Sequence, residues 1–413
     1  MLLLFLCVLA VHGMSVGALA WGWHRAVRSP SSERLPQKTP PIATEAAADG
    51  VRANGSNPDD PDADDPDADA DLPPLSVVIA LRDEHAHLDD LLSALDRQTH
   101  PNVEFVLVDD ASTDATPARL AAWAADRSDV QRIRITQPQA PRKKHALARG
   151  IAAATHDLLA FTDADCVPPP EWLRTLAWHH RAHAQRTPAR DTVLIGYSPM
   201  QRHDGWRGAL LSAWARYETF LAGTYAIAAA GLGCAYTAVG RNLSYPKAVF
   251  ERVGGFDTSG MSGDDDLFVQ AVRRHDAAEV RAVVHPEAFV PTAPPDSWSA
   301  WLHQKRRHVS AGRAYDGVSA TALTLMNSAG VLLWLAPLVL GATGLGLLAI
   351  GLLLRQLVLG PAAEGLRETS LLALFPLGEA AYALYHVLVV PIGLIRPPAT
   401  WSAPARSPSP SDA

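Results

Sequence analysis

The first 23 residues, MLLLFLCVLAVHGMSVGALAWGW, contain no aspartate, glutamate, lysine or arginine. An uncharged apolar run of this length is sufficient to cross a bilayer as a helix, which requires about 20 residues. A cleaved signal peptide normally begins with a basic segment, and this run has none. Basic residues follow the run instead, at Arg25, Arg28, Arg34 and Lys38. By the positive-inside rule, we expect residues 1–24 to form a transmembrane helix with its N-terminus outside and the next domain in the cytosol.

Further apolar segments lie near the other end of the chain. Residues 321–354 are uncharged throughout and suit one long tilted helix or two short ones, and residues 371–395 suffice for another. We therefore expect two or three transmembrane helices within residues 316–396. Residues 397–413 are rich in proline and serine and are expected to be a disordered tail. The sequence predicts a multi-pass protein of the inner cell membrane.

The acidic residues are concentrated in one segment. The net charge is −7, but eight aspartates fall within residues 59–71, and without these eight the net charge would be +1. Residues 25–74 have few large apolar side chains, so we expect an extended, self-repelling linker rather than a domain. A calcium site would need the EF-hand spacing and its closing glutamate, which this segment lacks. Because the rest of the chain is nearly neutral, no nucleic-acid partner is expected.

An α/β pattern begins at Leu75. Strands are expected at two short β-branched runs, 76–81 and 103–108, and further strands are plausible at 130–135, 157–162 and 192–197. Helical patterns at 88–98 and 145–154 alternate with these strands, which predicts a mostly parallel sheet flanked by helices, with ligands at its carboxyl edge. Residues 208–240 are apolar but rich in alanine and glycine. We interpret them as a helix on the membrane surface or a buried core segment rather than a span.

Acidic residues follow the expected strands in an ordered series. Glu84 comes after the first strand, Asp110 after the second, and Asp163 and Asp165 after the fourth. A fourth group, SGDDDLF, contains Asp264, Asp265 and Asp266. In an extended segment residues i and i+2 point to the same side, so Asp163 and Asp165 can present two carboxylates together. Hard oxygen ligands of this kind suit Mg²⁺ or Mn²⁺ bound jointly with a diphosphate.

These motifs, in this order and together with GGFD (254–257) and QKRRH (304–308), resemble a membrane-anchored family-2 glycosyltransferase with the GT-A nucleotide-sugar-binding fold. The resemblance extends from about Ser76 to His308, and loosely into the C-terminal helices. It implies an α/β fold, with residues 75–315 forming the GT-A domain and its interfacial helices.

The resemblance assigns residues to the donor. The loop containing Glu84 would receive the nucleotide base, and Asp110 would hydrogen-bond that base. Lys143, in RKKHALARG, matches a lysine near the phosphates, although Ala148 stands where the family has asparagine. A solvated helix start is an equally acceptable interpretation for Lys143 and Lys144. Asp163 and Asp165 match the D-x-D pair, with Asp165 the more direct ligand of Mg²⁺ or Mn²⁺.

The resemblance also assigns the catalytic acid. SGDDDL fits a G-E-D-x-D-L pattern, with Asp264 as the general base, Asp265 as second choice, and Gly263 in place of glutamate. An inverting transfer needs such a base to take a proton from the acceptor hydroxyl as it attacks the anomeric carbon. Clustered carboxylates raise one another's pKa, which favours a base but could also leave one of them neutral.

The QKRRH segment resembles the family's Q/R-x-x-R-W motif. Gln304 and Arg307 match, while His308 replaces tryptophan. Arginine is suited to the diphosphate because it binds phosphate oxygens bidentately. The alternative for this segment is a basic anchor that binds anionic lipid beside the membrane.

On the acceptor side, the resemblance suggests contacts from Arg241 and Asn242, which precede the GGFD turn. Trp301 could stack on a sugar, although an aromatic belt at the membrane interface is the alternative. The histidines of HHRAH (179–183) lack a paired carboxylate motif and are expected on the surface rather than at a metal.

The sequence therefore predicts a cytosol-facing, membrane-bound, metal-dependent, inverting hexosyltransferase of the cell-envelope polysaccharide type. Its partners would be a UDP- or GDP-linked sugar, a lipid-linked or glycan hydroxyl acceptor, and the bilayer. Two alternatives within the enzyme class are a polyprenyl-phosphate sugar transferase and a processive polysaccharide synthase. A catalytically inactive scaffold with the same fold is the alternative outside it.

Overall fold

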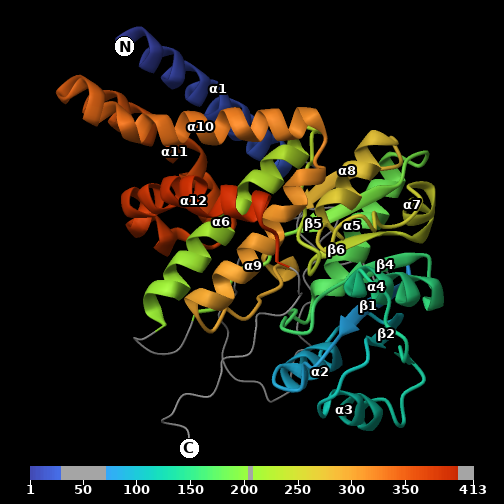
Figure 1. Cartoon of the computed structure of the whole chain (residues 1–413). Coiled ribbons are helices and arrows are strands. Elements are labelled where there is room, and N and C mark those ends of the chain that lie inside the picture. The colour runs from blue at the N-terminus through green and yellow to red at the C-terminus, as the bar shows by residue number, and fades with distance from the viewer. Residues whose placement is uncertain (29–70, 203–207, 399–413) are drawn as a thin grey trace, which may run out of the picture.

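The structure is a computed structural model that describes residues 1–28, 71–202 and 208–398. Most of the expected linker (25–74) and tail (397–413) lies outside the described residues. Near the N-terminus, helix α1 (Leu2–Val27) corresponds to the expected first transmembrane segment. An α/β domain follows, and further long helices lie beyond it (Figure 1).

The α/β domain is built on one seven-stranded sheet with the order β3-β2-β1-β4-β6-β5-β7. All five expected strands are present, within a residue or two of the expected bounds. The strands are β1 (Leu75–Leu81), β2 (Val103–Asp109), β3 (Val130–Arg134), β4 (Leu158–Phe161), β5 (Thr192–Gly196), β6 (Leu243–Pro246) and β7 (Glu279–Val283).

The sheet is mixed, with one strand running against its neighbours. β1 pairs in parallel with β2 and β4, β2 with β3, and β5 with β7, whereas β6 is antiparallel to both β4 and β5. The expectation of a mostly parallel sheet is therefore confirmed. The two strands that were not expected, β6 and β7, are short and carry the polar sequences LSYP and EVRAV.

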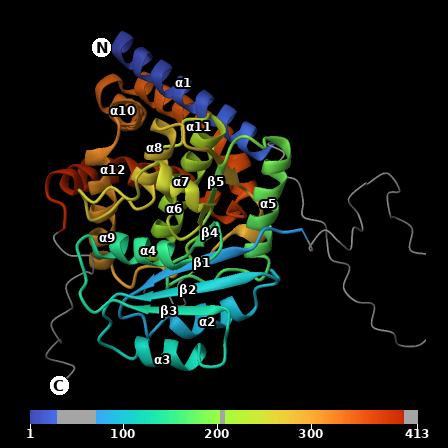
Figure 2. The ribbon, with the colours of Figure 1, turned by 90° about the vertical axis from the view of Figure 1, so that its right-hand side faces the viewer.

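Alternate residues of the central strand β1 face two separate cores. Val77 and Ile79 pack in the cluster that contains α2, whereas Val78 packs with α4 and α6 on the other face. Figure 2 shows α4 on one side of the sheet and α2 and α3 on the other. Helix α4 approaches closely because Gly150 lacks a side chain, and a Cβ there would lie 2.5 Å from Val78 Cγ1.

The helices of the α/β domain follow the strands as the alternating pattern requires. They are α2 (Leu88–Asp96), α3 (Thr116–Trp123), α4 (Arg142–Ala153), α5 (Trp172–Arg186), α6 (Ala209–Gly231), α7 (Lys247–Arg252), α8 (Asp266–Arg274) and α9 (Trp298–Ala311). Helix α6, in the apolar stretch 208–240, is buried along most of its length. It is thus a core segment, one of the two alternatives expected for this stretch.

Helix α1 crosses α6 where both helices have glycine. A Cβ on Gly231 would lie 1.9 Å from the carbonyl oxygen of Gly22, so no larger residue fits the crossing. The expected first membrane segment is therefore packed directly on the domain's long core helix.

Four segments are long and apolar enough to cross a membrane: α1, α10 (Gly317–Leu340), α11 (Ala342–Gly365) and Thr369–Ile395. The last consists of the 3₁₀ turn η4 (Thr369–Leu374) and α12 (Phe375–Ile395). The apolar run 321–354 forms parts of two helices because the chain turns at Gly341, whose φ is +58°. Three of these four segments follow the α/β domain.

Candidate active site

A cavity of about 440 Å³ lies at the carboxyl ends of β1, β2 and β4 and extends between α6, α9 and α12. Most of the residues that the sequence singled out line it, although they come from positions more than 200 residues apart. These are Glu84, Asp110, Lys143, Asp163, Asp165, Arg241, Asp264, Asp265, Gln304 and Arg307.

Lys143 connects two of the acidic motifs. Its Nζ lies 2.9 Å from Asp163 Oδ1 and 3.2 Å from Asp264 Oδ2. Burial opposes the charge on Lys143, but the two carboxylates outweigh it and raise the pKa of the ammonium group. For Asp163, burial also opposes ionisation, and Lys143 nevertheless holds the pKa of this carboxyl below its usual value. The first turn of α4 thus places one cation between the residues after β4 and those before α8.

Asp110 is held by a residue that the sequence did not single out. Arg142, at the start of α4, donates from Nε to Asp110 Oδ2 at 2.7 Å, and both residues line the cavity. The basic run RKK was a signal in the sequence. Of the three residues of this run, only Lys143 has a counterpart in the family motif, which is why Arg142 was missed.

Glu84 lies in the loop after β1, beside the D-x-D pair. Its backbone N–H donates to Thr116 Oγ1 at 2.9 Å, which ties this loop to α3. Burial raises the pKa of Glu84 to about 7, and the negative charges of Asp165 and Asp163 add to the effect.

The three consecutive aspartates at the start of α8 have different environments. Asp265 accepts from the N–H of Gly240 at 2.9 Å and from the N–H of Asp266 at 2.8 Å. Asp266 accepts hydrogen bonds from Thr237 and, at 2.6 Å, from the Tyr315 hydroxyl. Burial, together with Asp266 and Asp264, raises the pKa of Asp265 to about 8. Asp264 forms the ion pair with Lys143 described above.

Lys144 is buried, in contrast to the solvated helix start that the sequence allowed. Its Nζ donates to the backbone oxygens of Asp257, Gly260 and Ser262 at 2.6, 2.9 and 2.7 Å. An ammonium group has three donors, and all three are used here. The lysine therefore fixes the loop that ends at Asp264.

Helix α9 directs its basic segment toward the cavity rather than only toward lipid. Gln304, Lys305, Arg307 and His308 all line the cavity. Lys305 forms an ion pair with Glu218 of α6, and neither residue was singled out from the sequence. Burial lowers the pKa of Arg307, although Asp264 and Asp163 oppose this effect. Arg306 instead donates to the carbonyl oxygen of Arg396 at 2.6 Å.

The three acceptor-side candidates are placed differently from one another. Arg241 lines the cavity and donates from Nε to Ser198 Oγ at 2.6 Å. Asn242 lies fully buried behind it, and its amide group bonds to the carbonyl oxygens of Tyr197 and Ala288 and to the indole of Trp172. Trp301 is 6% exposed and packs edge-on against Trp214 and Trp298. Asn242 and Trp301 are not among the described residues that line the cavity.

The histidines of HHRAH do not lie on the surface, and that expectation was wrong. His179 and His183 are buried on α5, and His180 lies 2.9 Å from Ser244 Oγ. Burial lowers the pKa of His179 to about 3. Helix α5 covers one face of the sheet. The hydropathy pattern of α5 does not reveal this burial because histidine counts as a polar residue.

The D-x-D pair has the chemistry required for a divalent ion. Asp163 and Asp165 are two residues apart and face the same cavity, and both offer hard oxygen ligands. Within residues 1–28, 71–202 and 208–398, no group of three or more histidine, cysteine, aspartate or glutamate residues could hold a metal by itself. The pair therefore fits an ion that takes its remaining ligands from a bound diphosphate.

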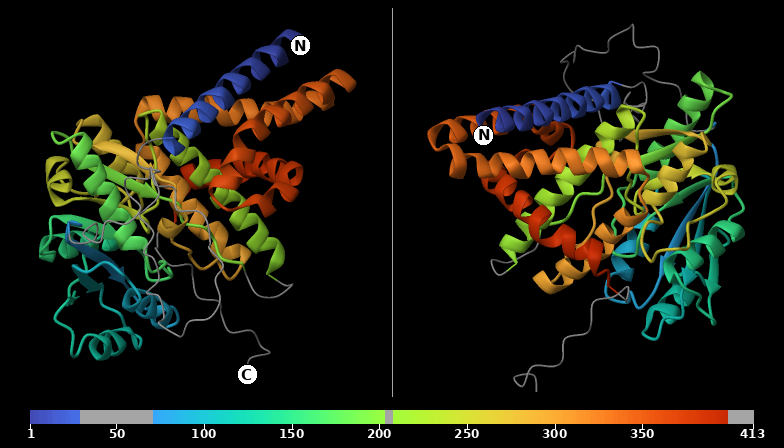
Figure 3. Two further views of the ribbon diagram at one scale, coloured as in Figure 1. Left: turned by 180° about the vertical axis from the view of Figure 1, so that it is seen from behind. Right: turned by 45° about the horizontal axis from the view of Figure 1, so that its top comes forward.

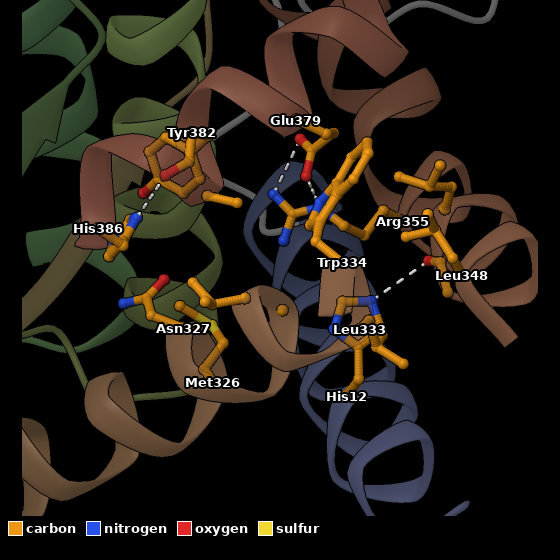
Figure 4. A pocket seen from close by; sticks show the side chains of 15 residues that line it. His12, Met326, Asn327, Leu333, Trp334, Leu348, Arg355, Glu379, Tyr382 and His386 are labelled. Carbon is orange, nitrogen blue, oxygen red and sulfur yellow. Dashed lines mark hydrogen bonds and ion pairs between the residues drawn. The ribbon is translucent and has the colours of Figure 1, made fainter. Parts of the chain in front are cut away.

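A second cavity, of about 30 Å³, lies between α1, α10, α11 and α12. Figure 4 shows Arg355 and Glu379 facing each other across it, with Nε and Oε2 2.6 Å apart. His12 Nε2 lies 3.2 Å from the carbonyl oxygen of Gly351. A space of this volume accommodates about one water molecule, so it is too small for a nucleotide or a sugar.

Two family models match the chain. "Glycosyl transferase family 2" matches residues 76–228, and "Glycosyl transferase family group 2" matches residues 158–394, more than half of the chain. Together they include every residue named above that lines the larger cavity.

Two relatives of known name match with similar identity. The validoxylamine A glucosyltransferase of Streptomyces hygroscopicus subsp. limoneus is 27% identical over 261 residues, which cover 57% of this chain and 53% of that protein. The pre-mycofactocin glycosyltransferase of Mycobacterium tuberculosis (strain ATCC 25618 / H37Rv) is 26% identical over 283 residues, 67% of this chain and 54% of that protein. The chain thus spans about half the length of these relatives.

Among solved structures, a mannosyltransferase of Pyrobaculum calidifontis in complex with GDP-Man and Mn²⁺ has a similar fold. The TM-score is 0.50 at 20% sequence identity, and the match covers 93% of this chain and 99% of that chain. The match confirms the expected fold.

Proposed function

The chain belongs to glycosyl transferase family 2, and on that premise we propose that it is a membrane-bound, metal-dependent, inverting enzyme. It transfers a sugar from a nucleotide diphosphate to a hydroxyl group of an acceptor. The observation that carries this proposal is the contact of Lys143 with both Asp163 and Asp264. One cation thereby brings the D-x-D pair, suited to a diphosphate, next to an acid suited to activate the attacking hydroxyl.

The donor occupies the end of the cavity at β1, β2 and β4. Asp110, fixed by Arg142, is positioned to accept hydrogen bonds from the base. Lys143 and Arg307 line the same cavity and stabilise the diphosphate, whose negative charge increases as the sugar leaves. The UDP- or GDP-linked class of donor is supported by the GDP-Man in the Pyrobaculum structure.

Asp163 and Asp165 would hold Mg²⁺ or Mn²⁺ together with the diphosphate. When bound, the ion supplies a Lewis acid that neutralises charge on the leaving group. The presence of Mn²⁺ in the Pyrobaculum structure supports this assignment.

Asp264 is the general base. Its carboxylate lines the cavity and is oriented by Lys143, whereas Asp265 and Asp266 are engaged by backbone, threonine and tyrosine donors. Asp264 takes the proton of the acceptor hydroxyl, the hydroxyl oxygen attacks the anomeric carbon, and the bond to the diphosphate breaks on the opposite face. The configuration of the sugar is thereby inverted.

Substitution of the base and of the D-x-D pair tests this function. We expect Asp264→Asn to lower sugar transfer by on the order of 10²- to 10⁴-fold while nucleotide binding remains. We expect Asp165→Ala to weaken the binding of UDP or GDP in the presence of Mn²⁺, measured by isothermal titration. Transfer is read as nucleotide release by membranes that contain the protein, followed by mass spectrometry of the lipid fraction.

Asp90→Asn is the matched control, since Asp90 is an exposed aspartate on α2, outside the cavity. It should bind nucleotide and transfer sugar as the wild type does. Folded Asp264→Asn and Asp165→Ala proteins that transfer sugar at the wild-type rate would contradict the proposal.

A further inference from the structure

The cavity has two halves of different chemistry. At the strand ends it is lined by acids and cations, among them Asp163, Lys143 and Arg307. The other half lies between α6, α9 and α12, and its α6 wall consists of Glu218, Thr219, Ala222, Gly223 and Ala226. Ala222 is exposed to this space although its neighbours along the buried helix α6 are covered. Small side chains thus leave room beside the donor site.

The charges in this second half neutralise each other. Glu218 of α6 and Lys305 of α9 form an ion pair, and each side chain is only 9% exposed. A buried pair of this kind contributes no net charge to its surroundings. The second half therefore has no net attraction for a diphosphate, and it suits an uncharged part of a ligand.

His308 adds a neutral polar group to the same space. Its side chain is exposed to the cavity, where the family motif places tryptophan. Partial desolvation by the cavity walls and the neighbouring cations Arg307 and Lys305 lower the pKa of His308 well below the usual value, which favours the uncharged imidazole. A neutral imidazole has one donor and one acceptor nitrogen and can bind a hydroxyl group.

The outer wall of this half is formed by α12, which has exposed aliphatic side chains on its other face. Tyr385 of α12 lines the cavity, while Leu384 and Leu388, one position before it and three after it, are 59% and 57% exposed. Helix α12 lies beside α6 and α9 (Figure 3). One helix thus has its polar aromatic residue on the cavity and its aliphatic residues on an apolar outer surface.

We propose that the space between α6, α9 and α12 is the acceptor subsite and that it takes an amphiphile with a hydroxyl-bearing head and an apolar chain. The inference rests on the glycosyl transfer proposed above. The head reaches Asp264 and His308, and the chain lies along Ala222 toward Tyr385. A free, fully polar glycan would leave hydroxyl groups against Ala222 and Ala226 without partners, which is costly.

Thiol protection tests the subsite without knowledge of the natural acceptor. Ala222→Cys is made in full-length protein with Cys7→Ser and Cys234→Ser, which leaves Cys166 buried, and the protein is placed in lipid nanodiscs. The rate of alkylation by N-ethylmaleimide is measured with glucose, or with butyl, hexyl or octyl β-glucoside below its micellar concentration. The control is Ala248→Cys on α7, which is exposed and does not line the cavity.

We expect the alkyl glucosides to protect the Ala222→Cys thiol and glucose to leave its rate unchanged. The half-protecting concentration should fall by about fourfold for each added methylene that is buried. The Ala248→Cys thiol should react at the same rate throughout. Equal protection by glucose and octyl glucoside, no protection by either, or equal protection of both thiols would each overturn the inference.

Nucleotide binding separates this inference from the proposed function. If UDP or GDP binds with Mn²⁺ but chain length has no effect on protection, the amphiphile subsite is wrong and the transferase proposal is retained. If neither nucleotide binds, the transferase proposal fails whatever the protection experiment shows.

Discussion

Lys143 and Lys144 are adjacent in the chain, yet their ammonium groups serve different partners. Lys143 contacts the acids of the cavity, whereas Lys144 holds three backbone carbonyl oxygens of the loop 257–262. We expect Lys144→Met to lower the free energy of unfolding by about 3 kcal/mol, because buried carbonyls lose a charged donor. Sugar transfer should also fall, because this loop positions Asp264, while the affinity for UDP or GDP with Mn²⁺ should change little.

Thermal unfolding and isothermal titration check this prediction. Lys247→Met is the matched control, since Lys247 donates to the carbonyl oxygen of Ala154 at 3.2 Å but is only partly buried. Lys247→Met should lower the free energy of unfolding by less than about 1 kcal/mol. Equal destabilisation by the two substitutions would show that the three-carbonyl contact has no special role.

Asp265 makes stability depend on pH. Burial and the charges of Asp266 and Asp264 raise the pKa of Asp265 to about 8 in the folded protein. The ordinary pKa of an aspartate carboxyl is 3.8. The folded state therefore binds a proton that the unfolded state has released. The stabilisation of the folded state by this bound proton is complete below pH 4 and is lost as the pH rises through 8. We expect wild-type stability to fall relative to Asp265→Asn by about 2 kcal/mol between pH 6 and pH 8.

Denaturant unfolding of the two proteins across this pH range measures the difference. Asp90→Asn is the reference for the loss of an exposed carboxyl and should leave the pH profile unchanged. A wild-type profile parallel to that of Asp265→Asn would contradict the raised pKa.

The residues at strand ends were predictable from the sequence, and their partners were not. Asp110, Asp163 and Asp165 follow short apolar runs, so the parallel-sheet rule places them at one edge. Arg142 and Lys144 acquire their roles only through tertiary contacts with other parts of the chain. No local pattern distinguishes such a contact from an ordinary basic helix start.

At the scale of elements, apolar periodicity predicted the first five strands but not β6 and β7. Leu243–Pro246 is only four residues long, and Glu279–Val283 alternates charged with apolar residues. These strands pair with β4 and β5, which supply the apolar surroundings that their own sequences lack. The composition of α6 favoured a core or surface helix over a membrane span, and α6 is buried along most of its length.

The contact between α11 and α12 depends on one ion pair in apolar surroundings. Arg355 and Glu379 are 12% and 5% exposed and are also bonded to Tyr225 and Tyr217 of α6. We expect Arg355→Met or Glu379→Leu alone to lower the free energy of unfolding by about 3–5 kcal/mol, because each substitution leaves a buried charge without its partner. The double variant should be close to the wild type in stability.

Thermal unfolding in nanodiscs completes this double-mutant cycle. Arg190→Met provides the comparison, since the ion pair of Arg190 with Asp276 is exposed. This substitution should lower the free energy of unfolding by less than about 1 kcal/mol. Strictly additive losses in the double variant would contradict the pairing.

For the whole molecule, α1, α10 and α11 project together away from the α/β domain (Figure 1). Phe5 packs with Ala336 and Leu347 at their far end. At the near end, Gly22 meets Gly231 of α6, and a Cβ on Gly365 would lie 2.8 Å from Trp23. The N-terminus and the turn at Gly341 are thus on one side, and the α/β domain is on the other, consistent with the cytosolic domain that the basic residues after α1 predict.

Helix α12 differs from these three, although its length and composition also permit a span. Near its start, a Cβ on Gly378 would lie 2.6 Å from Tyr217 of α6, and near its end, a Cβ on Gly393 would lie 3.0 Å from Val309 of α9. Both ends of α12 therefore lie against helices of the α/β domain. Its exposed leucines suit the membrane surface as well as the interior. We predict that α12 lies along the cytosolic interface and does not cross the bilayer.

Thiol labelling of intact and permeabilised cells distinguishes the two arrangements. In protein with Cys7→Ser and Cys234→Ser, Thr343→Cys, at the start of α11, should react with a membrane-impermeant maleimide in intact cells. Ala248→Cys and Ile395→Cys should react only after permeabilisation, because an interfacial α12 keeps its C-terminal end on the side of the α/β domain. Labelling of Ile395→Cys in intact cells, with Ala248→Cys still protected, would mean that α12 crosses the membrane and that its contacts with α6 and α9 are broken there.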